Sequence, residues 1–284
     1  MNRILVIGGT GTVGRHVLCQ LIQQGAQVRA LVRNPKDACL PPQVEVVCGD
    51  LTLPNTLDAS LDGIDTVFLV WVAPLGAVAP ALEQITKHAR RIVFLSAPLK
   101  TAHPLFQQPN AGRELALRIE RLIEESGIQW TFLRPGMFAA NARFWWGPQI
   151  RSGDIVRWPY LAVPTAPIDE RDIAAVAARA LCEDGHAQAE YVLTGPQSLT
   201  QLEQVSAIAD AIGRSLRIED ISPEEARREL LTIMPLPVIN MLLDAWSAAK
   251  GQPAFVTSTV ERITRAPARN FSDWATDHAA DFLA

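Results

Sequence analysis

The chain is poor in the residue types that build cross-linked, metal-bound or membrane-spanning proteins. Its 284 residues include four cysteines, none of them in a C-x-x-C pair, and five histidines whose spacing matches no metal site. No apolar run is long enough to cross a bilayer, and the first residues lack the apolar stretch of a secretion signal. We therefore expect no metal site, no membrane partner, and free thiols in a reducing cytoplasm.

Neither sign of charge is in large excess. Lys and Arg number 26 against 30 Asp and Glu, and no stretch of the chain concentrates the basic side chains. Because nucleic-acid surfaces need a basic patch, we expect no nucleic-acid partner. With 48% hydrophobic and 20% charged residues, the composition instead indicates a folded globular protein.

Short apolar runs alternate with amphipathic stretches through the first half of the chain. Such runs are typical of strands that are buried on both faces of a parallel sheet. Between them apolar side chains recur at helical spacing, as in Val13, Val17 and Leu21. The predicted fold class is α/β, with a doubly wound parallel Rossmann sheet. Its expected strands cover residues 3–7, 27–32, 44–48, 66–70, 91–95 and 130–133.

The texture of the sequence changes after Pro135. Residues 136–168 are rich in glycine, proline and aromatic side chains, and further helical and strand patterns follow them. We predict a dinucleotide-binding domain over residues 1–135 and a smaller C-terminal α/β substrate lobe over residues 136–284, partly interleaved with the first domain.

Several helix starts mark this second part. Asp169, Thr200 and Ser222 are residues of the type that caps helices, and proline follows Ser222 at the first helical position. Residues 190–193 and 216–221 have the composition of strands. The smaller lobe is therefore expected to contain both helices and strands.

A glycine-rich loop follows the first expected strand and opens the first expected helix. Its pattern, Gly9-x-Gly11-x-x-Gly14, is that of a dinucleotide-binding turn, and the alternative is a glycine turn without a ligand. Free N–H groups and a partial positive charge at the helix start favour the phosphates. The residues predicted to contact the dinucleotide here are Gly8, Gly9, Thr10, Gly11, Thr12, Val13 and Gly14.

The end of the second expected strand bears on which dinucleotide binds. NAD sites usually place an acidic residue there to bind the ribose 2′-hydroxyl, yet no carboxylate occurs between Ala26 and Lys36. Arg33 and Lys36 stand there instead, and both suit a 2′-phosphate. We predict NADP(H), with a solvated surface role of Arg33 as the alternative.

Three further loops are expected to border the cofactor. Asp50, with Leu51 beside it, follows the third strand and either accepts a hydrogen bond from the adenine amino group or caps a turn. The loops after the fourth and sixth strands lie at the same edge of the sheet. Their predicted cofactor contacts are Val70, Trp71, Val72, Pro135, Met137 and Phe138.

Further motifs are spread over most of the chain. They are Gly49-Asp50, Val93-Phe94-Leu95-Ser96, Glu120 with Ser126-Gly127, residues 130–136, Asn141, residues 172–174, residues 191–196 and residues 270–275. Together with the glycine loop and Arg33, they resemble those of atypical, NmrA-like short-chain dehydrogenases/reductases. The later half is also similar to azoreductase-like proteins and to ergot-alkaloid reductases that reduce iminium intermediates.

This resemblance implies an NADP-binding fold with a substrate pocket between the two lobes. Members of the family include reductases, isomerising enzymes and redox sensors that bind NADP without turnover. Typical short-chain dehydrogenases carry Tyr-x-x-x-Lys on the helix expected here at about residues 110–126, but that stretch has neither residue type. The resemblance puts Ala116 where related proteins have Lys, so carbonyl reduction by the usual mechanism is not expected.

Three side chains remain as candidates for the chemistry. Ser96 ends the fifth strand and could hydrogen-bond the substrate or the cofactor, or simply close a turn. His103 could donate a proton, although an exposed loop histidine is the plainer interpretation, and Tyr160 is a further candidate donor. The aromatic and methionine residues that either line an apolar pocket or form the core of the smaller lobe are Phe144, Trp145, Trp146, Trp158 and Met234.

Two functions follow from these observations. The first is an NADPH-dependent oxidoreductase that transfers hydride to a small apolar or aromatic acceptor, such as an iminium, quinone-like or azo compound, because such acceptors need little acid help. The second is a non-catalytic NADP(H)-sensing regulator. The aromatic-rich segment favours an enclosed site for a small-molecule substrate, whereas the missing Tyr-x-x-x-Lys pair favours the sensor.

Overall fold

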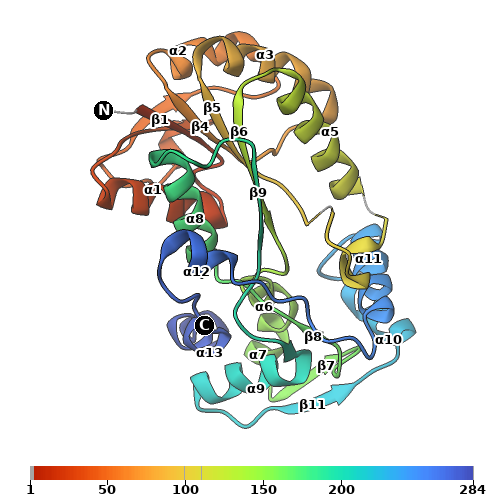
Figure 1. Ribbon diagram of the computed structural model, residues 1–284. Coiled ribbons are helices and arrows are strands. Elements are labelled where there is room, and N and C mark those ends of the chain that lie inside the picture. The colour runs from red at the N-terminus through yellow and green to blue at the C-terminus, as the bar shows by residue number, and fades with distance from the viewer. Residues whose placement is uncertain (1–2, 99, 110, 284) are drawn as a thin grey trace.

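Seven parallel strands form the large sheet of this computed structural model, which describes residues 3–98, 100–109 and 111–283. Their order across the sheet is β3-β2-β1-β4-β5-β6-β9 (Figure 1). The strands are β1 (Arg3–Ile7), β2 (Gln27–Val32), β3 (Glu45–Cys48), β4 (Thr66–Leu69), β5 (Arg91–Leu95), β6 (Gln129–Pro135) and β9 (Ala189–Leu193).

Both faces of this sheet are covered, as the alternation of its side chains requires. Ile4 and Val6 point to one face and pack with α1 (Thr12–Gln23) and α8 (Glu170–Cys182). Leu5 and Ile7 point to the other face and pack with α3 (Val78–His88) and α5 (Ala111–Glu125). The predicted doubly wound α/β fold is therefore confirmed (Figure 1).

The remaining helices connect these layers or build the smaller lobe. On the large sheet they are the short turns η1 (Pro35–Asp37), η2 (Pro54–Thr56) and η3 (Leu75–Ala77), with α2 (Asp58–Leu61) and α12 (Thr259–Thr264). Helix α4 (Pro104–Gln107) packs instead against the core of the smaller lobe through Leu105. In the smaller lobe they are α6 (Asn141–Trp145), α7 (Gly147–Ser152), α9 (Gln201–Ile212), α10 (Pro223–Leu230), α11 (Leu236–Ala248), α13 (Phe271–Asp277) and α14 (Ala280–Leu283).

The smaller lobe has its own core and two short strand pairs. β7 (Ile155–Trp158) pairs in parallel with β11 (Arg217–Asp220), and β8 (Pro164–Thr165) pairs antiparallel with β10 (Leu199–Thr200). Tryptophans dominate the interior of this lobe, and the four that pack ring against ring are Trp145, Trp146, Trp158 and Trp246.

The later part of the chain also returns to the large sheet. α8 packs on the sheet, and β9 pairs with β6 as the seventh strand of the sheet. Residues 170–193, although late in the sequence, therefore pack with the first half of the chain. The domain boundary at residue 135 stays a prediction. Asp169, Thr200 and Ser222 cap their helices as expected, the last two in complete capping boxes.

Strand ends differ most from the expectation at β6, which runs to Pro135 rather than to residue 133. Arg134 breaks the apolar pattern there, yet it is buried because Glu120 and Glu190 pair with its guanidinium. Within the described residues, no helix combines the length and apolar character that a bilayer crossing requires.

Candidate active site

The direction of strand order reverses between β1 and β4, and a groove opens there at the carboxyl ends of the strands. From β1 the order runs outward to β3, and from β4 it runs the other way through β5 and β6. Open α/β sheets bind ligands at such a reversal. The groove has a volume of about 670 Å³, and the loops after β1, β2, β3 and β4 line it.

The glycine loop after β1 is shaped so tightly that side chains would not fit. Gly8 has φ +90°, and a Cβ added there would lie 2.7 Å from the Val70 Cβ. A Cβ on Gly14 would lie 2.1 Å from the carbonyl oxygen of Gly8. Gly11 then caps α1 without a side-chain hydrogen bond, which leaves the first helical amides to a ligand. This cradle fits a diphosphate.

The residues of this loop divide into two groups. Gly8, Thr10 and Gly11 line the groove itself. Val13 and Gly14 are buried in the packing of α1 on the sheet, so they shape the turn from beneath. Contacts between this loop and a dinucleotide stay a prediction.

The loop after β2 brings opposite charges to the groove. Arg33 lines it and is exposed, whereas Lys36, in η1, is exposed but lies outside the described lining. Asp37 lines the groove too, and its carboxylate contacts the Asn34 amide. Asp37 was not predicted, because it lies one residue beyond the stretch from Ala26 to Lys36 that contains no carboxylate. A 2′-phosphate would thus meet one guanidinium with one carboxylate close by.

Asp50 lies on the groove wall in a turn. Its Oδ1 accepts hydrogen bonds from the backbone N–H of Thr52 and from the Thr52 hydroxyl, both at 2.8 Å. The backbone hydrogen bond, with the hydroxyl, lowers the pKa of the Asp50 carboxyl. Asp50 therefore has the turn role, and its adenine contact stays a prediction. Leu51 beside it is buried and also lines the groove.

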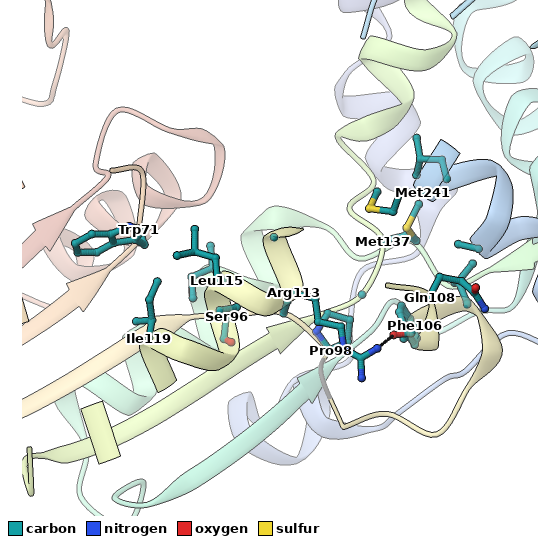
Figure 2. A pocket seen from close by; sticks show the side chains of 18 of the residues that line it. Trp71, Ser96, Pro98, Phe106, Gln108, Arg113, Leu115, Ile119, Met137 and Met241 are labelled. Atoms are coloured by element: carbon teal, nitrogen blue, oxygen red, sulfur yellow. Dashed lines mark hydrogen bonds between the residues drawn. The ribbon is translucent and has the colours of Figure 1, made fainter. Parts of the chain in front are cut away.

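A second hollow adjoins the groove at Val70, which borders both. This cavity has a volume of about 440 Å³ and lies between the large sheet and the smaller lobe (Figure 2). Trp71 lines the cavity, whereas Val72 lines the groove and is 73% exposed. The other residues that line the cavity are Phe94, Leu95, Ser96, Ala97, Pro98, Leu105, Phe106, Gln108, Gly112, Arg113, Leu115, Ala116, Ile119, Gly136, Met137, Met241, Leu242, Ala245 and Trp246.

Ser96 brings one hydroxyl to this cavity, and a buried ion pair orients it. Its Oγ donates to Oε1 of Glu120 at 2.6 Å. Arg134 donates to the same carboxylate from Nε at 3.0 Å and from Nη2 at 2.7 Å, and both partners are buried. Because the single hydroxyl hydrogen points to Glu120, Ser96 offers lone pairs, rather than a proton, to a ligand.

The Arg134 guanidinium completes this network. Burial alone would lower the pKa of Arg134, but hydrogen bonds to Glu120 and Glu190 outweigh burial and raise that pKa above its ordinary value. Lys100 pairs with Glu190 at 2.8 Å. The charges behind Ser96 are therefore balanced within the network.

Helix α5 presents small residues where a Tyr-x-x-x-Lys pair would stand. The family pattern puts Lys at Ala116, and the tyrosine position four residues earlier is Gly112. Both line the cavity, and Ala116 is buried. The missing pair therefore contributes empty space to the cavity.

His103 is buried, so the expected exposed loop position is wrong. Its Nδ1 accepts from the backbone N–H of Leu105 at 3.2 Å and caps α4, while Nε2 lies 2.9 Å from the carbonyl oxygen of Pro253 and donates to it. Through these two hydrogen bonds His103 joins the start of α4 to the chain segment at Pro253. His103 is not among the described residues that line the cavity.

Tyr160 lies apart from Ser96. It has φ +57° and borders a different hollow in the smaller lobe, where the Lys250 ammonium lies 4.9 Å from its ring centroid. The described cavity lining does not include it. The structure therefore brings only Ser96, of the three candidate catalytic residues, into the cavity.

The tryptophans after Pro135 form core rather than cavity wall, whereas Phe144 does neither. Trp146 and Trp158 are fully buried inside the smaller lobe, and Trp145 and Met234 pack against them. Phe144 is 66% exposed. Of the loop after β6, Gly136 and Met137 line the cavity, Pro135 ends the strand, and Phe138 forms a bridge with Ile168.

The far wall of the cavity was not predicted from the sequence. Helix α11 supplies it through Met241, Leu242, Ala245 and Trp246. These residues recur at helical spacing on one face, which was the available signal. Nothing in the local pattern tells which helix such a face covers. Among the described residues, no group of three or more His, Cys, Asp or Glu side chains is arranged to hold a metal ion.

Comparison with known proteins places this geometry in a family. Residues 8–184 match the model of an NAD(P)H-binding family. A (4-alkanoyl-5-oxo-2,5-dihydrofuran-3-yl)methyl phosphate reductase of Streptomyces griseus is 36% identical over 98% of this chain and 99% of its own. An NAD(P)H azoreductase of Xenophilus azovorans is 35% identical over the same shares.

A solved structure supports the fold. Triphenylmethane reductase of Citrobacter sp., complexed with NADP(H), superposes with a TM-score of 0.82 at 20% identity, over 97% of this chain and 99% of its own. The family match covers more than half of the chain, and the two relatives match nearly end to end. The chain therefore belongs to the NAD(P)H-binding family of NmrA-like, atypical short-chain dehydrogenases/reductases.

Proposed function

We propose that the protein is an NADPH-dependent reductase that transfers hydride to a small apolar or aromatic acceptor held in the cavity. One observation carries this proposal: Val70 borders both the groove and the cavity, so a dinucleotide in the groove would reach the cavity with one end. The cavity is enclosed largely by apolar side chains, as small-molecule sites are.

The residues that would hold the cofactor follow the groove from end to end. The amides after Gly8 and Gly11 would bind the diphosphate, and Arg33 would bind the 2′-phosphate. Met137 and Ser96 would border the nicotinamide end. When bound, the reduced cofactor would supply a hydride, which alone completes the reduction of an iminium, whereas a quinone-like or azo acceptor would also take up one proton from solvent.

The side chains of the cavity position the acceptor and exclude water. Ser96 accepts a hydrogen bond from a ligand, because its own hydrogen is donated to Glu120. Gly112 and Ala116 leave room for a ring on the helix that would otherwise carry the acid. This arrangement favours quinone-like, azo or iminium acceptors, whose reduction needs little acid help, over simple aldehydes.

The relatives support this acceptor class, because their names describe reductases of an oxo-dihydrofuran and of azo compounds. The four cysteines are free and three of them are exposed, which fits a small-molecule enzyme of a reducing cytoplasm. The lack of a Tyr-x-x-x-Lys pair also fits a second candidate, a sensor that binds NADP(H) without turnover.

The test is consumption of NADPH in the presence of a naphthoquinone, an azo dye, a cyclic iminium and an aldehyde. We expect turnover of one or more of the first three and at most slow turnover of the aldehyde. If calorimetry shows tight NADPH binding but no acceptor is turned over, the proposal of a reductase would give way to that of a sensor.

A further inference from the structure

A serine hydroxyl lies in the part of the cavity that adjoins the groove. Val70 and Trp71 mark this end, and Figure 2 shows Ser96 toward Trp71 and away from Gln108. The indole N–H of Trp71 is already donated to the carbonyl oxygen of Ala73 at 2.6 Å. Among the described side chains, a ligand at this end therefore finds its hydrogen-bonding group at Ser96.

The hydrogen of this hydroxyl is donated to a buried carboxylate. The Oγ of Ser96 lies 2.6 Å from Oε1 of Glu120. Both carboxylate oxygens of Glu120 also accept hydrogen bonds from the buried guanidinium of Arg134, at 3.0 and 2.7 Å. A carboxylate paired in this way has no hydrogen to give, so the direction of the hydrogen bond from Ser96 to Glu120 is fixed.

The lone pairs of Ser96 are left for a ligand. Within the residues that the structure describes, no group donates a hydrogen bond to its Oγ, and its side chain is half-buried in the cavity wall. A donor on the ligand would satisfy this acceptor, whereas a carbonyl oxygen or an unprotonated nitrogen would set lone pair against lone pair. Ser96 therefore distinguishes ligands by whether they carry a hydrogen at this point.

We propose that the acceptor carries an N–H or O–H group beside its reducible bond, that Ser96 binds this donor, and that Glu120 is the positioning residue that fixes the polarity of Ser96. An aminoquinone, the hydrazone form of a hydroxy-azo compound and an iminium with an N–H group belong to this class. A quinone without such a substituent and an N-alkylated iminium do not. The inference rests on the proposed function in taking the cavity as the acceptor site, but donor binding is measurable without turnover.

The first experiment measures binding of aminonaphthoquinone and of methylnaphthoquinone, substituted at the same carbon, by calorimetry with the protein saturated with NADP⁺. The two substituents are similar in size, but only the amino group donates. We expect the affinity ratio to favour the aminoquinone about fivefold more in the wild type than in Ser96→Ala, because one hydrogen bond is lost. Ser96→Thr, which keeps the hydroxyl, should retain most of the wild-type ratio. Ser206→Ala, at an exposed serine of α9, is the matched control and should keep all of it.

The second experiment tests the positioning role of Glu120. In Glu120→Gln an amide that can donate as well as accept replaces the carboxylate, so Ser96 can turn its hydrogen to the ligand and the affinity ratio should fall toward that of Ser96→Ala. In the Ser96→Ala background the same substitution should change the ratio by less than about twofold, a result that general structural damage would not give. Circular dichroism and thermal melts verify folding, and the Ser96 variants decide the proposal alone if Glu120→Gln does not fold.

The outcomes separate this inference from the proposed reductase. The same affinity ratio in the wild type and in Ser96→Ala, or no binding of either quinone, would overturn the role of Ser96. A loss of NADPH affinity in Ser96→Ala with an unchanged ratio would also overturn it, because the lone pairs would then serve the cofactor. Reduction of methylnaphthoquinone by NADPH would still support the reductase in each of these cases. Selective binding of the aminoquinone through Ser96 without reduction of any acceptor would support the donor site and remove the reductase.

Discussion

The groove and the cavity meet at Val70 but are built from different parts of the chain. Four successive strand-to-loop turns within the first 74 residues line the groove, and its shape depends on backbone conformation at glycines. The cavity draws its side chains from segments that extend to Trp246. The cofactor site thus depends on backbone geometry, which many relatives can share, whereas acceptor choice depends on side chains that can change one at a time.

The largest expected effect comes from the backbone of the groove. Gly14→Ala places a Cβ within 2.1 Å of the Gly8 carbonyl oxygen, so the loop must shift. We expect NADPH affinity to fall about 100-fold or more, or the protein to lose its native fold, because strain of this size exceeds ~3 kcal/mol. Calorimetry with NADPH, beside a thermal melt, measures both.

The matched control is Gly153→Ala in the smaller lobe. An added Cβ meets no atom within 4 Å there, and the backbone is extended, so binding and stability should stay near those of the wild type. Wild-type affinity in Gly14→Ala would show that the tight turn is not what holds the cofactor.

A smaller effect is expected from charge at the far end of the groove. Arg33→Asp should change the ratio of NADPH to NADH affinity about 10- to 100-fold toward NADH, because a guanidinium–phosphate pair is lost. Asp37→Asn should move the ratio several-fold the other way, since its carboxylate lines the same groove. Affinities for both cofactors that stay unchanged in Arg33→Asp would contradict the NADP(H) assignment.

A change in the cavity should affect the acceptor and spare the cofactor. Ala116→Phe fills space on the inner face of α5, and we expect the kcat/KM for the acceptor to fall about tenfold. NADPH affinity should stay within about twofold. Leu117→Phe adds the same side chain on the outer face, where Leu117 is 40% exposed, and serves as the control. If Ala116→Phe lowered NADPH affinity as much as the kcat/KM for the acceptor, the two sites would not be separable.

The same contrast explains what the sequence predicts well. The boundaries of β1, β2 and β5 and the glycine loop follow from short-range patterns, and the structure has these strands where they were expected. His103 and Tyr160 were misleading because residue type gives chemistry but not position. The α11 wall of the cavity could not be predicted, because only tertiary packing brings α5, α4 and α11 around one cavity.

The smallest expected effect tests the scaffold that both sites share. Burial lowers the pKa of His186, whose Nδ1 lies 2.8 Å from the Tyr191 hydroxyl between α8 and β9. The unfolded chain therefore takes up a proton near its ordinary pKa of 6.5 before the native state does, so stability is full above that pH and falls as pH decreases below it. Melts between about pH 7.5 and pH 5.5 should show this fall.

His186→Gln should reduce the decrease in melting temperature by on the order of 2 °C, while His16, whose pKa burial also lowers, keeps part of it. A decrease of the same size in His186→Gln and in the wild type would contradict the assignment of this pH dependence to His186.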